Sequence, residues 1–103
     1  MVDIVHGMST VDFHWNEEKN ELLKASERDI SFETTVEEIA DGNLVEVLKH
    51  RSGAQSLLLV IVRGNYVYVV PAVRETNGTL FLKTAYPSRK FTRKYLGNNN
   101  GEK

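Results

Sequence analysis

The stretch of the chain richest in groups that could do chemistry covers residues 86–96, YPSRKFTRKYL. It places four cationic side chains within six consecutive positions: Arg89, Lys90, Arg93 and Lys94. Proline tolerates the first turn of a helix and serine caps it, so Pro87 and Ser88 predict a helix start. At 100° per residue, Phe91 and Tyr95 share one side of that helix and the cations occupy the others. We expect a short helix that docks by its aromatic residues and turns a cationic face to an anionic partner or simply to solvent.

One histidine is placed where it could transfer protons. His50 stands between Lys49 and Arg51 at the predicted end of a strand, where loops often carry functional groups. The neighbouring cations favour the neutral imidazole, which can act as a base near pH 7. The alternative is a strand-end histidine that contacts nothing. Because His6 and His14 lie at no ligand spacing on a helix with it, we expect no metal site.

A cationic helix and a neutral histidine together suit the cleavage of RNA without a metal. In that reaction a base deprotonates the 2′-hydroxyl, cations stabilise the phosphorane, and an acid protonates the leaving oxygen. Arginine binds phosphate bidentately, which assigns Arg89 and Arg93 to the phosphate with Lys90 in support. His50 would be the general base or acid. A tyrosine such as Tyr95 could stack on a splayed base, although most tyrosines of this chain suit core positions.

Composition sets the protein class. A chain of 103 residues suits one domain, and 41% hydrophobic and 26% charged residues are ordinary for a globular protein. The absence of cysteine excludes disulfides and thiolate metal sites. No apolar run approaches the roughly 20 residues of a membrane span, and the N-terminus does not read as a signal peptide. We therefore expect a cytoplasmic protein with no membrane contact.

Charge is divided unequally between the halves. Residues 1–50 sum to −8 and residues 51–103 to +7, although the whole chain carries only −1. This division suggests that the second half presents a positive surface to an anionic partner, or that the two halves neutralise each other within the fold, or both.

The first half predicts a leader, a strand and two helices. Residues 1–10 lack pattern and form the leader, and alternation predicts a strand over 11–15. A helix should run from the Asn16 cap to Arg28. A second should run from the Ser31 cap to Gly42. The expected buried positions are Leu22, Leu23 and Ala25 in the first helix, and Phe32, Val36, Ile39 and Ala40 in the second.

The second half predicts strands over 44–51, 57–62, 66–73 and 79–84, the second of them covered on both sides. Pro71 should turn its missing N–H to an edge, a bulge or a strand end. Asn77-Gly78 predicts a hairpin turn. The domain spans 11–97, and 98–103 form a disordered tail. The fold class is thus α+β: an antiparallel meander sheet covered by helices on one face.

The segment FHWNEEKNELLKASERDISFETTVEEIADG resembles the opening of BrnT-like toxins of bacterial type II toxin–antitoxin systems. The shared features are an aromatic–acidic–Trp-Asp/Asn start, a lysine-bearing helix and an -ISFEE- second helix. The end, KTAYPSRKFTRKYL, is similar to the Arg/Lys-rich end of that group, so the resemblance covers about residues 11–97. It implies a RelE-like fold and an mRNA endoribonuclease that needs no metal or cofactor. It also implies a cognate DNA-binding antitoxin, through which oligomers would mainly form.

The resemblance assigns residues one at a time. Lys19 matches the lysine that follows the Trp-Asp/Asn start, and the basic terminal motif is matched by Arg89, Lys90 and Arg93. The family commonly has Lys-His-Gly where this chain has Glu27-Arg28-Asp29, so His50 becomes the substitute histidine. In a related toxin subgroup ending in -PSRK-T-KYL, a strand-end histidine matches His50.

The expected site has two parts. The catalytic residues would be His50, Arg89, Lys90 and Arg93. The RNA-binding residues would be Lys19, Lys49, Arg51, Lys83, Lys94 and Tyr95. The alternative function is a non-enzymatic module that uses the basic helix to bind nucleic acid or to dock an antitoxin.

Overall fold

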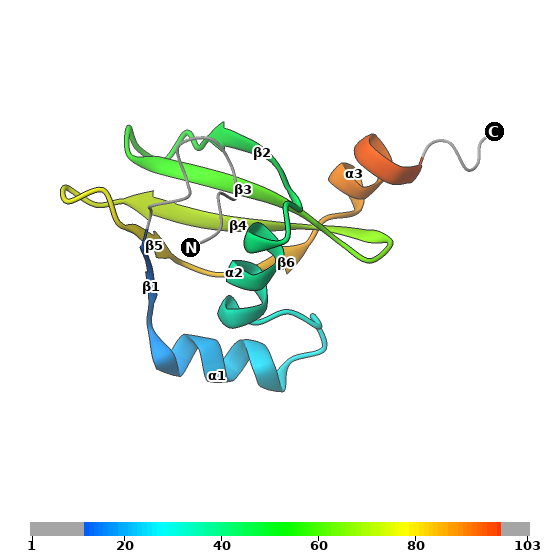
Figure 1. Ribbon diagram of the computed structural model, residues 1–103, viewed down its shortest axis with the longest axis horizontal. Helices are drawn as coiled ribbons and strands as arrows, with labels where there is room; N and C mark the ends of the chain where they lie inside the picture. The colour runs from blue at the N-terminus through cyan, green and yellow to red at the C-terminus, as the bar shows by residue number, and fades with distance from the viewer. Residues whose placement is uncertain (1–11, 98–103) are drawn as a thin grey trace.

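The chain folds into one sheet with helices on its sides (Figure 1). The structure is a computed structural model that describes residues 12–97, so the predicted leader and tail lie outside the described residues. The elements follow in this order: β1 (Phe13–Trp15), α1 (Glu17–Ala25), α2 (Phe32–Ala40), β2 (Leu44–Lys49), β3 (Ser56–Arg63), β4 (Tyr66–Arg74), β5 (Leu80–Leu82), β6 (Tyr86–Pro87), α3 (Arg89–Thr92) and the π-helical turn η1 (Arg93–Gly97). The α+β class is therefore confirmed. Within this part of the chain no helix is long and apolar enough to cross a membrane.

The sheet is a meander with two additions. Strands β2, β3, β4 and β5 are antiparallel neighbours, as predicted. However, β1 pairs in parallel with β5, and the short strand β6 pairs with β4 beyond the end of β5. The prediction of a purely antiparallel sheet is therefore wrong for β1, whereas β6 is an antiparallel strand that was not predicted. Parallel pairing of β1 requires a long crossover, which α1, α2 and the meander together provide.

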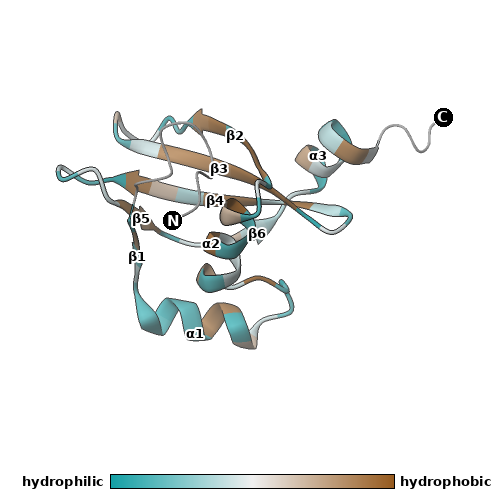
Figure 2. Cartoon of the chain, in the orientation of Figure 1, coloured by the Kyte–Doolittle hydropathy of each residue, from teal (hydrophilic) through white to brown (hydrophobic). Residues whose placement is uncertain are grey.

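One face of the sheet holds the main core. Leu59 of β3 and Val70 of β4 are fully buried there, against the predicted stripe of α2. Phe32 and Ile39 of that stripe are fully buried, and Val36 is partly buried. Figure 2 shows the apolar colouring concentrated in β3 and β4 and the polar colouring in the turns and α1. We call this side of the sheet the helical face.

The opposite side, which we call the second face, is partly covered by the C-terminal helix. Residues opposed across antiparallel strands point to the same face, so Glu46, Val60 and Val69 share it. Val60 and Val69 are almost completely buried although they do not belong to the main core. Lys94 forms an ion pair with Glu46 at 3.8 Å, which places η1 over this face. The prediction that all helices cover one face is therefore wrong for α3.

Helix α1 is shorter and less buried than predicted. It ends at Ala25, because Ser26 adopts an extended conformation and its hydroxyl donates to the Leu23 carbonyl at 2.8 Å. Leu23 is buried, but Leu22 is 66% exposed and Ala25 is also exposed. The inward positions are Asn20 and Leu23, three residues apart, which leaves Leu22 on the outer side.

The turns and strand ends follow local sequence signals with small shifts. Strand β2 stops at Lys49 instead of residue 51, and β5 covers Leu80–Leu82 instead of residues 79–84. Pro71 lies inside β4, and its carbonyl accepts the Lys83 N–H at 2.8 Å. The Pro71 nitrogen lies on the same side of β4 as this carbonyl, between the segments paired with β5 and β6. The absence of an N–H at Pro71 therefore removes no hydrogen bond between paired strands. Gly78 has a φ of 89°, which the predicted hairpin turn requires.

Candidate functional site

Helix α3 is anchored to the sheet through hydroxyl groups. Ser88 caps it, because the Ser88 hydroxyl accepts the Phe91 N–H at 3.1 Å. The Ser88 N–H in turn donates to the Val67 carbonyl at 2.9 Å. Thr92 Oγ1 accepts the Val67 N–H at 2.8 Å and donates to the Ser88 carbonyl at 2.7 Å. Pro87, predicted as part of the helix start, instead lies in β6. These bonds hold the helix at the start of β4, next to the β3–β4 turn (Figure 1).

The cations of residues 89–94 are exposed on a helix, as predicted, but the π-helical form of its second half was not predicted. Four α-helical residues are followed by a π-helical turn. Such turns are rare in proteins, and those that occur are often found at functional sites. Phe91 and Tyr95 still stack, with ring centroids 6.2 Å apart. Lys90 lies 5.7 Å from the Phe91 ring and Lys94 lies 5.3 Å from the Tyr95 ring. The four exposed cations are Arg89, Lys90, Arg93 and Lys94.

Most of these cations have no acidic partner nearby. Among residues 12–97, Arg89, Lys90 and Arg93 form no ion pair, and only Lys94 meets a carboxylate, that of Glu46. The helix therefore retains a net positive face. This decides one of the open questions from the sequence: the acidic first half does not neutralise this helix within the described residues.

His50 is held by the turn that follows β2. The Ser52 N–H donates to His50 Nδ1 at 3.1 Å, and Ser52 Oγ lies 2.7 Å from the same atom. A backbone N–H can only donate, so Nδ1 carries the lone pair and the neutral ring has its proton on Nε2. His50 therefore has a fixed ring orientation, and its Nε2–H has no hydrogen-bond partner among residues 12–97. His50 follows the last residue of β2 directly, and its ring contacts Ser52 of the same turn.

A small pocket of about 190 Å³ opens beside His50. His50, Ser56 and Val73 lie in one row across β2, β3 and β4, since the His50 N–H donates to the Ser56 carbonyl and Ser56 pairs with Val73. Lys83 joins them from the segment after β5, above Pro71. The polar residues that line the pocket are His50, Ser52, Ser56 and Lys83, and no carboxylate of residues 12–97 lines it. The pocket thus combines a hydrogen-bond donor and a cation, which suits an anion such as a phosphate.

The structure does not bring His50 and Arg89 together. Ser88 is bonded to Val67, which pairs with Val62, whereas His50 is bonded to Ser56. Six residues of β3 separate Val62 from Ser56, or about 20 Å at the usual strand rise. Figure 1 shows the β2–β3 turn and α3 at opposite ends of the sheet. One phosphate therefore cannot be bound at the same time by His50 and by the start of the helix, as the sequence prediction required.

The other predicted contacts are divided between the two faces. Lys49, Arg51 and Lys83 lie around the His50 end of the sheet, and all three are exposed. Tyr95 lies on η1 and stacks with Phe91. Lys19 lies on α1, on the side of the sheet that carries the main core (Figure 1). Lys19 is therefore separated by the sheet from both the His50 pocket and η1, so we leave it out of the candidate site.

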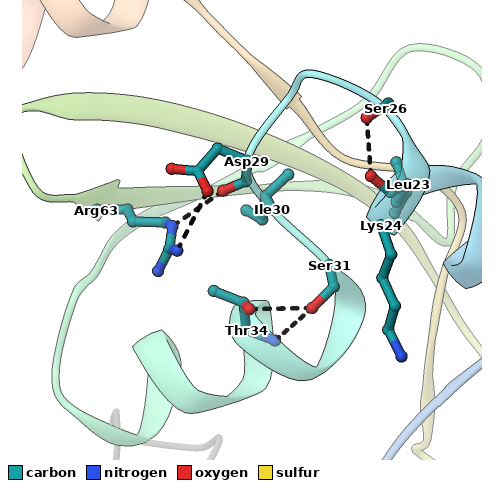
Figure 3. A pocket seen from close by; sticks show the side chains of 8 residues that line it. All are labelled: Leu23, Lys24, Ser26, Asp29, Ile30, Ser31, Thr34 and Arg63. Atoms are coloured by element: carbon teal, nitrogen blue, oxygen red, sulfur yellow. Dashed lines mark hydrogen bonds and ion pairs between the residues drawn. The ribbon is translucent and has the colours of Figure 1, made fainter.

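A second pocket, of about 260 Å³, lies on the helical side at the loop between α1 and α2 (Figure 3). Arg63 closes it: Nε donates to the Asp29 carbonyl at 3.1 Å and Nη1 donates to Glu38 at 3.0 Å. Asp29 has a φ of 61°, an unusual value for a residue other than glycine. The arginine is committed to holding this loop, so we assign the pocket a structural role. No sequence motif marked Arg63.

Asn20 is the other residue that sequence reasoning missed. It is fully buried, its Nδ2 donates to Glu33 at 2.8 Å, and its Oδ1 accepts the Phe32 N–H at 2.8 Å. The hydrogen bond from Asn20 lowers the pKa of Glu33. The sequence signal was the spacing of Asn20 three residues before Leu23, which puts an amide on the buried stripe of α1.

No group of three or more potential metal-ligating side chains occurs within residues 12–97. Comparison of the chain with protein-family models, with curated proteins and with solved structures finds no match. The site must therefore be interpreted from its own geometry.

Proposed function

We propose that this protein is a metal-independent endoribonuclease that acts as the toxin of a type II toxin–antitoxin pair. The observation that carries the proposal is the fixed imidazole of His50 beside Lys83, on the same sheet face over which the cationic η1 turn lies. The resemblance of both ends of the chain to BrnT-like toxins with a RelE-like fold points in the same direction. In this proposal the cytoplasm is its compartment, and a DNA-binding antitoxin is its protein partner.

The geometry favours one division of roles. The neutral His50 ring offers Nε2–H, so it is suited to donate a hydrogen bond to a phosphate oxygen. As the imidazolium, His50 would transfer a proton to the leaving 5′-oxygen and return to the neutral ring, while hydroxide from the solvent takes the proton of the attacking 2′-hydroxyl. Lys83 lines the same pocket and would stabilise negative charge on the phosphorane. Arg89, Lys90 and Arg93 would bind other phosphates of the same RNA, because they lie too far from His50 to share its phosphate. Arg51 would contact the RNA backbone beside the pocket, whereas Lys49 opposes Leu57 of the main core and points to the helical face.

A second candidate is a non-enzymatic module that binds nucleic acid or an acidic antitoxin segment through the basic helix. It is favoured by the separation between His50 and Arg89, and by the bonds to Ser52 that could equally serve to shape the turn. Binding alone should survive His50→Ala with its salt dependence unchanged, whereas cleavage should not.

Growth on induction tests the proposal in cells. Expression of the wild-type protein should arrest growth and degrade mRNA, and expression of the His50→Ala variant should not. The double variant Arg89→Ala/Arg93→Ala should also lose toxicity, since it removes two phosphate contacts. Lys19→Ala is the matched control, because it removes one positive charge on the opposite side of the sheet. Growth arrest by His50→Ala equal to that of the wild-type protein would exclude the proposed catalytic pocket.

A further inference from the structure

The part of the second face that lies between η1 and His50 is an apolar floor with a cationic border. The row next to the pocket pairs Leu48 with Leu58 and Leu58 with Pro71, and all three are half-buried. The row through the pocket continues from Val73 to Phe81 of β5. This floor is distinct from the main core, to which none of these residues belongs.

Phe81 has no role in the account so far. It is half-buried in the middle of β5, whereas its neighbours Leu80 and Leu82 are almost completely buried on the helical face. Because side chains alternate along a strand, Phe81 points to the second face. Lys83 follows two residues later and lines the pocket. An aromatic ring on a sheet face next to a cation is the arrangement that binds unpaired bases in proteins.

The charges around the floor select an anionic occupant. Arg51 and Lys83 lie at its His50 end, and Arg93 lies on η1, whereas Lys49 opposes Leu57 of the main core and therefore points to the helical face. Arg51, Lys83 and Arg93 form no ion pair within residues 12–97, and Glu46, the carboxylate that shares this face, is paired with Lys94. A ligand that combines flat apolar groups with regularly spaced negative charges complements both the floor and its border. Single-stranded nucleic acid has that chemistry.

We propose that the second face is a platform for an unpaired stretch of nucleic acid, with one base stacked on Phe81 and the adjacent phosphate in the pocket at Lys83. The strand continues along the floor to the cations of η1 and α3. The helix and the pocket lie about 20 Å apart along β3, which corresponds to roughly six nucleotides at the 3.4 Å rise of a stacked strand. This inference deepens the proposed function and names its substrate as single-stranded, because a duplex would keep its bases away from Phe81.

The test measures binding without cleavage, so its failure can be told apart from failure of the nuclease proposal. Fluorescence anisotropy with end-labelled oligothymidylates of two, four, six and eight nucleotides gives Kd for a probe that has no 2′-hydroxyl to react. Affinity should rise up to about six nucleotides and then level off. Phe81→Ala should weaken binding of the eight-nucleotide probe about tenfold, within the range measured for base–aromatic stacking. Phe81→Leu keeps the apolar packing and should bind the probe as weakly as Phe81→Ala. Its thermal unfolding should match that of the wild-type protein, which shows that the fold is intact.

Two further measurements distinguish single-stranded nucleic acid from a duplex and from an acidic protein segment. Lys83→Ala should weaken binding and Lys19→Ala should not, although both remove one charge. A duplex of the same length should bind at least about tenfold more weakly than the single strand. The proposal is overturned if Phe81→Ala and Phe81→Leu both bind as tightly as the wild-type protein, or if the duplex binds equally well. It is also overturned if polyglutamate displaces the oligonucleotide at equal charge concentration, since that result would assign the face to an acidic protein segment. Loss of RNA cleavage with intact oligothymidylate binding would contradict the nuclease proposal alone.

Discussion

The Oδ1 atom of Asn20 accepts the backbone N–H of Phe32 at 2.8 Å, and so an α1 side chain satisfies the first N–H group of α2. The first N–H groups of a helix have no partner inside the helix. Because Asn20 is fully buried, this side chain and not bulk solvent satisfies the Phe32 N–H. This bond fixes the position of α1 relative to the start of α2, because a hydrogen bond depends on direction and the apolar contacts around it do not.

Replacing Asn20 should therefore destabilise the whole domain. Asn20→Ala leaves the Phe32 N–H unsatisfied and opens a small cavity, which should cost about 2–3 kcal/mol in the free energy of unfolding. Urea denaturation followed by circular dichroism measures this change. Leu22→Ala, on the same helix but 66% exposed, should change the unfolding free energy by less than about 0.5 kcal/mol. Equal losses in the two variants would show that the buried amide has no special role.

Glu33 predicts a small dependence of stability on pH. The hydrogen bond from Asn20 lowers the pKa of Glu33 below its ordinary value of 4.5. A depressed folded-state pKa means that the ionised carboxylate stabilises the fold above pH 4.5, and that this contribution is lost as the pH falls through the folded-state value. Since the side chain is 46% exposed, the effect should be modest.

The comparison with Glu33→Gln isolates this contribution. Urea midpoints of the two proteins should differ most near pH 6, and the difference should shrink as the pH is lowered from 4.5 to 3. A difference that stays constant over this range would mean that ionisation of Glu33 does not stabilise the fold.

Thr92 should determine whether the cationic helix stays docked. Thr92→Val keeps the shape of the side chain but removes the acceptor of the Val67 N–H and the donor to the Ser88 carbonyl. We expect a loss of about 1–2 kcal/mol and faster amide hydrogen exchange over residues 88–97. Thr76→Val, in the exposed β4–β5 turn, is the matched control and should leave both quantities unchanged. Unchanged exchange in Thr92→Val would place the anchoring of α3 elsewhere.

Ser52 should act on catalysis by positioning His50. Ser52→Ala keeps the backbone N–H to Nδ1 and loses only the hydroxyl contact of 2.7 Å. The ring should therefore keep its tautomer but lose part of its fixed orientation. We expect kcat for RNA cleavage to fall about tenfold with KM unchanged and with an altered pH–rate profile. A rate equal to that of the wild-type protein would limit Ser52 to shaping the turn.

Local signals explain how much of this fold the sequence predicts. The Ser31 cap, the stripe of Phe32 and Ile39, and the Asn77-Gly78 turn each depend on residues close in the chain, and the structure has all three. The meander is predictable for the same reason, since its strands are neighbours in sequence. The parallel pairing of β1 with β5 is not, because it joins segments more than sixty residues apart.

The candidate site shows the same limit. The cationic helix and the strand-end histidine could both be predicted, because local composition and alternation indicate them. Their separation depends on the register of β3 with β4, and this register places Ser56 opposite Val73 and Val62 opposite Val67. No pattern within either segment contains that information. Lys83 was among the predicted RNA contacts, but Phe81 was unremarkable until the sheet placed it opposite Val73, on the same face as Lys83.

The most direct measurement is incubation of the purified protein with single-stranded RNA in the presence of EDTA, followed by separation of the products on a denaturing gel. We expect discrete cuts by the wild-type protein and by Lys19→Ala. His50→Ala should cut at least about 100-fold more slowly, in keeping with the loss of one proton-transfer group. Intact RNA after incubation with the folded wild-type protein, or equal cutting by His50→Ala, would contradict the assignment of this pocket as a ribonuclease site.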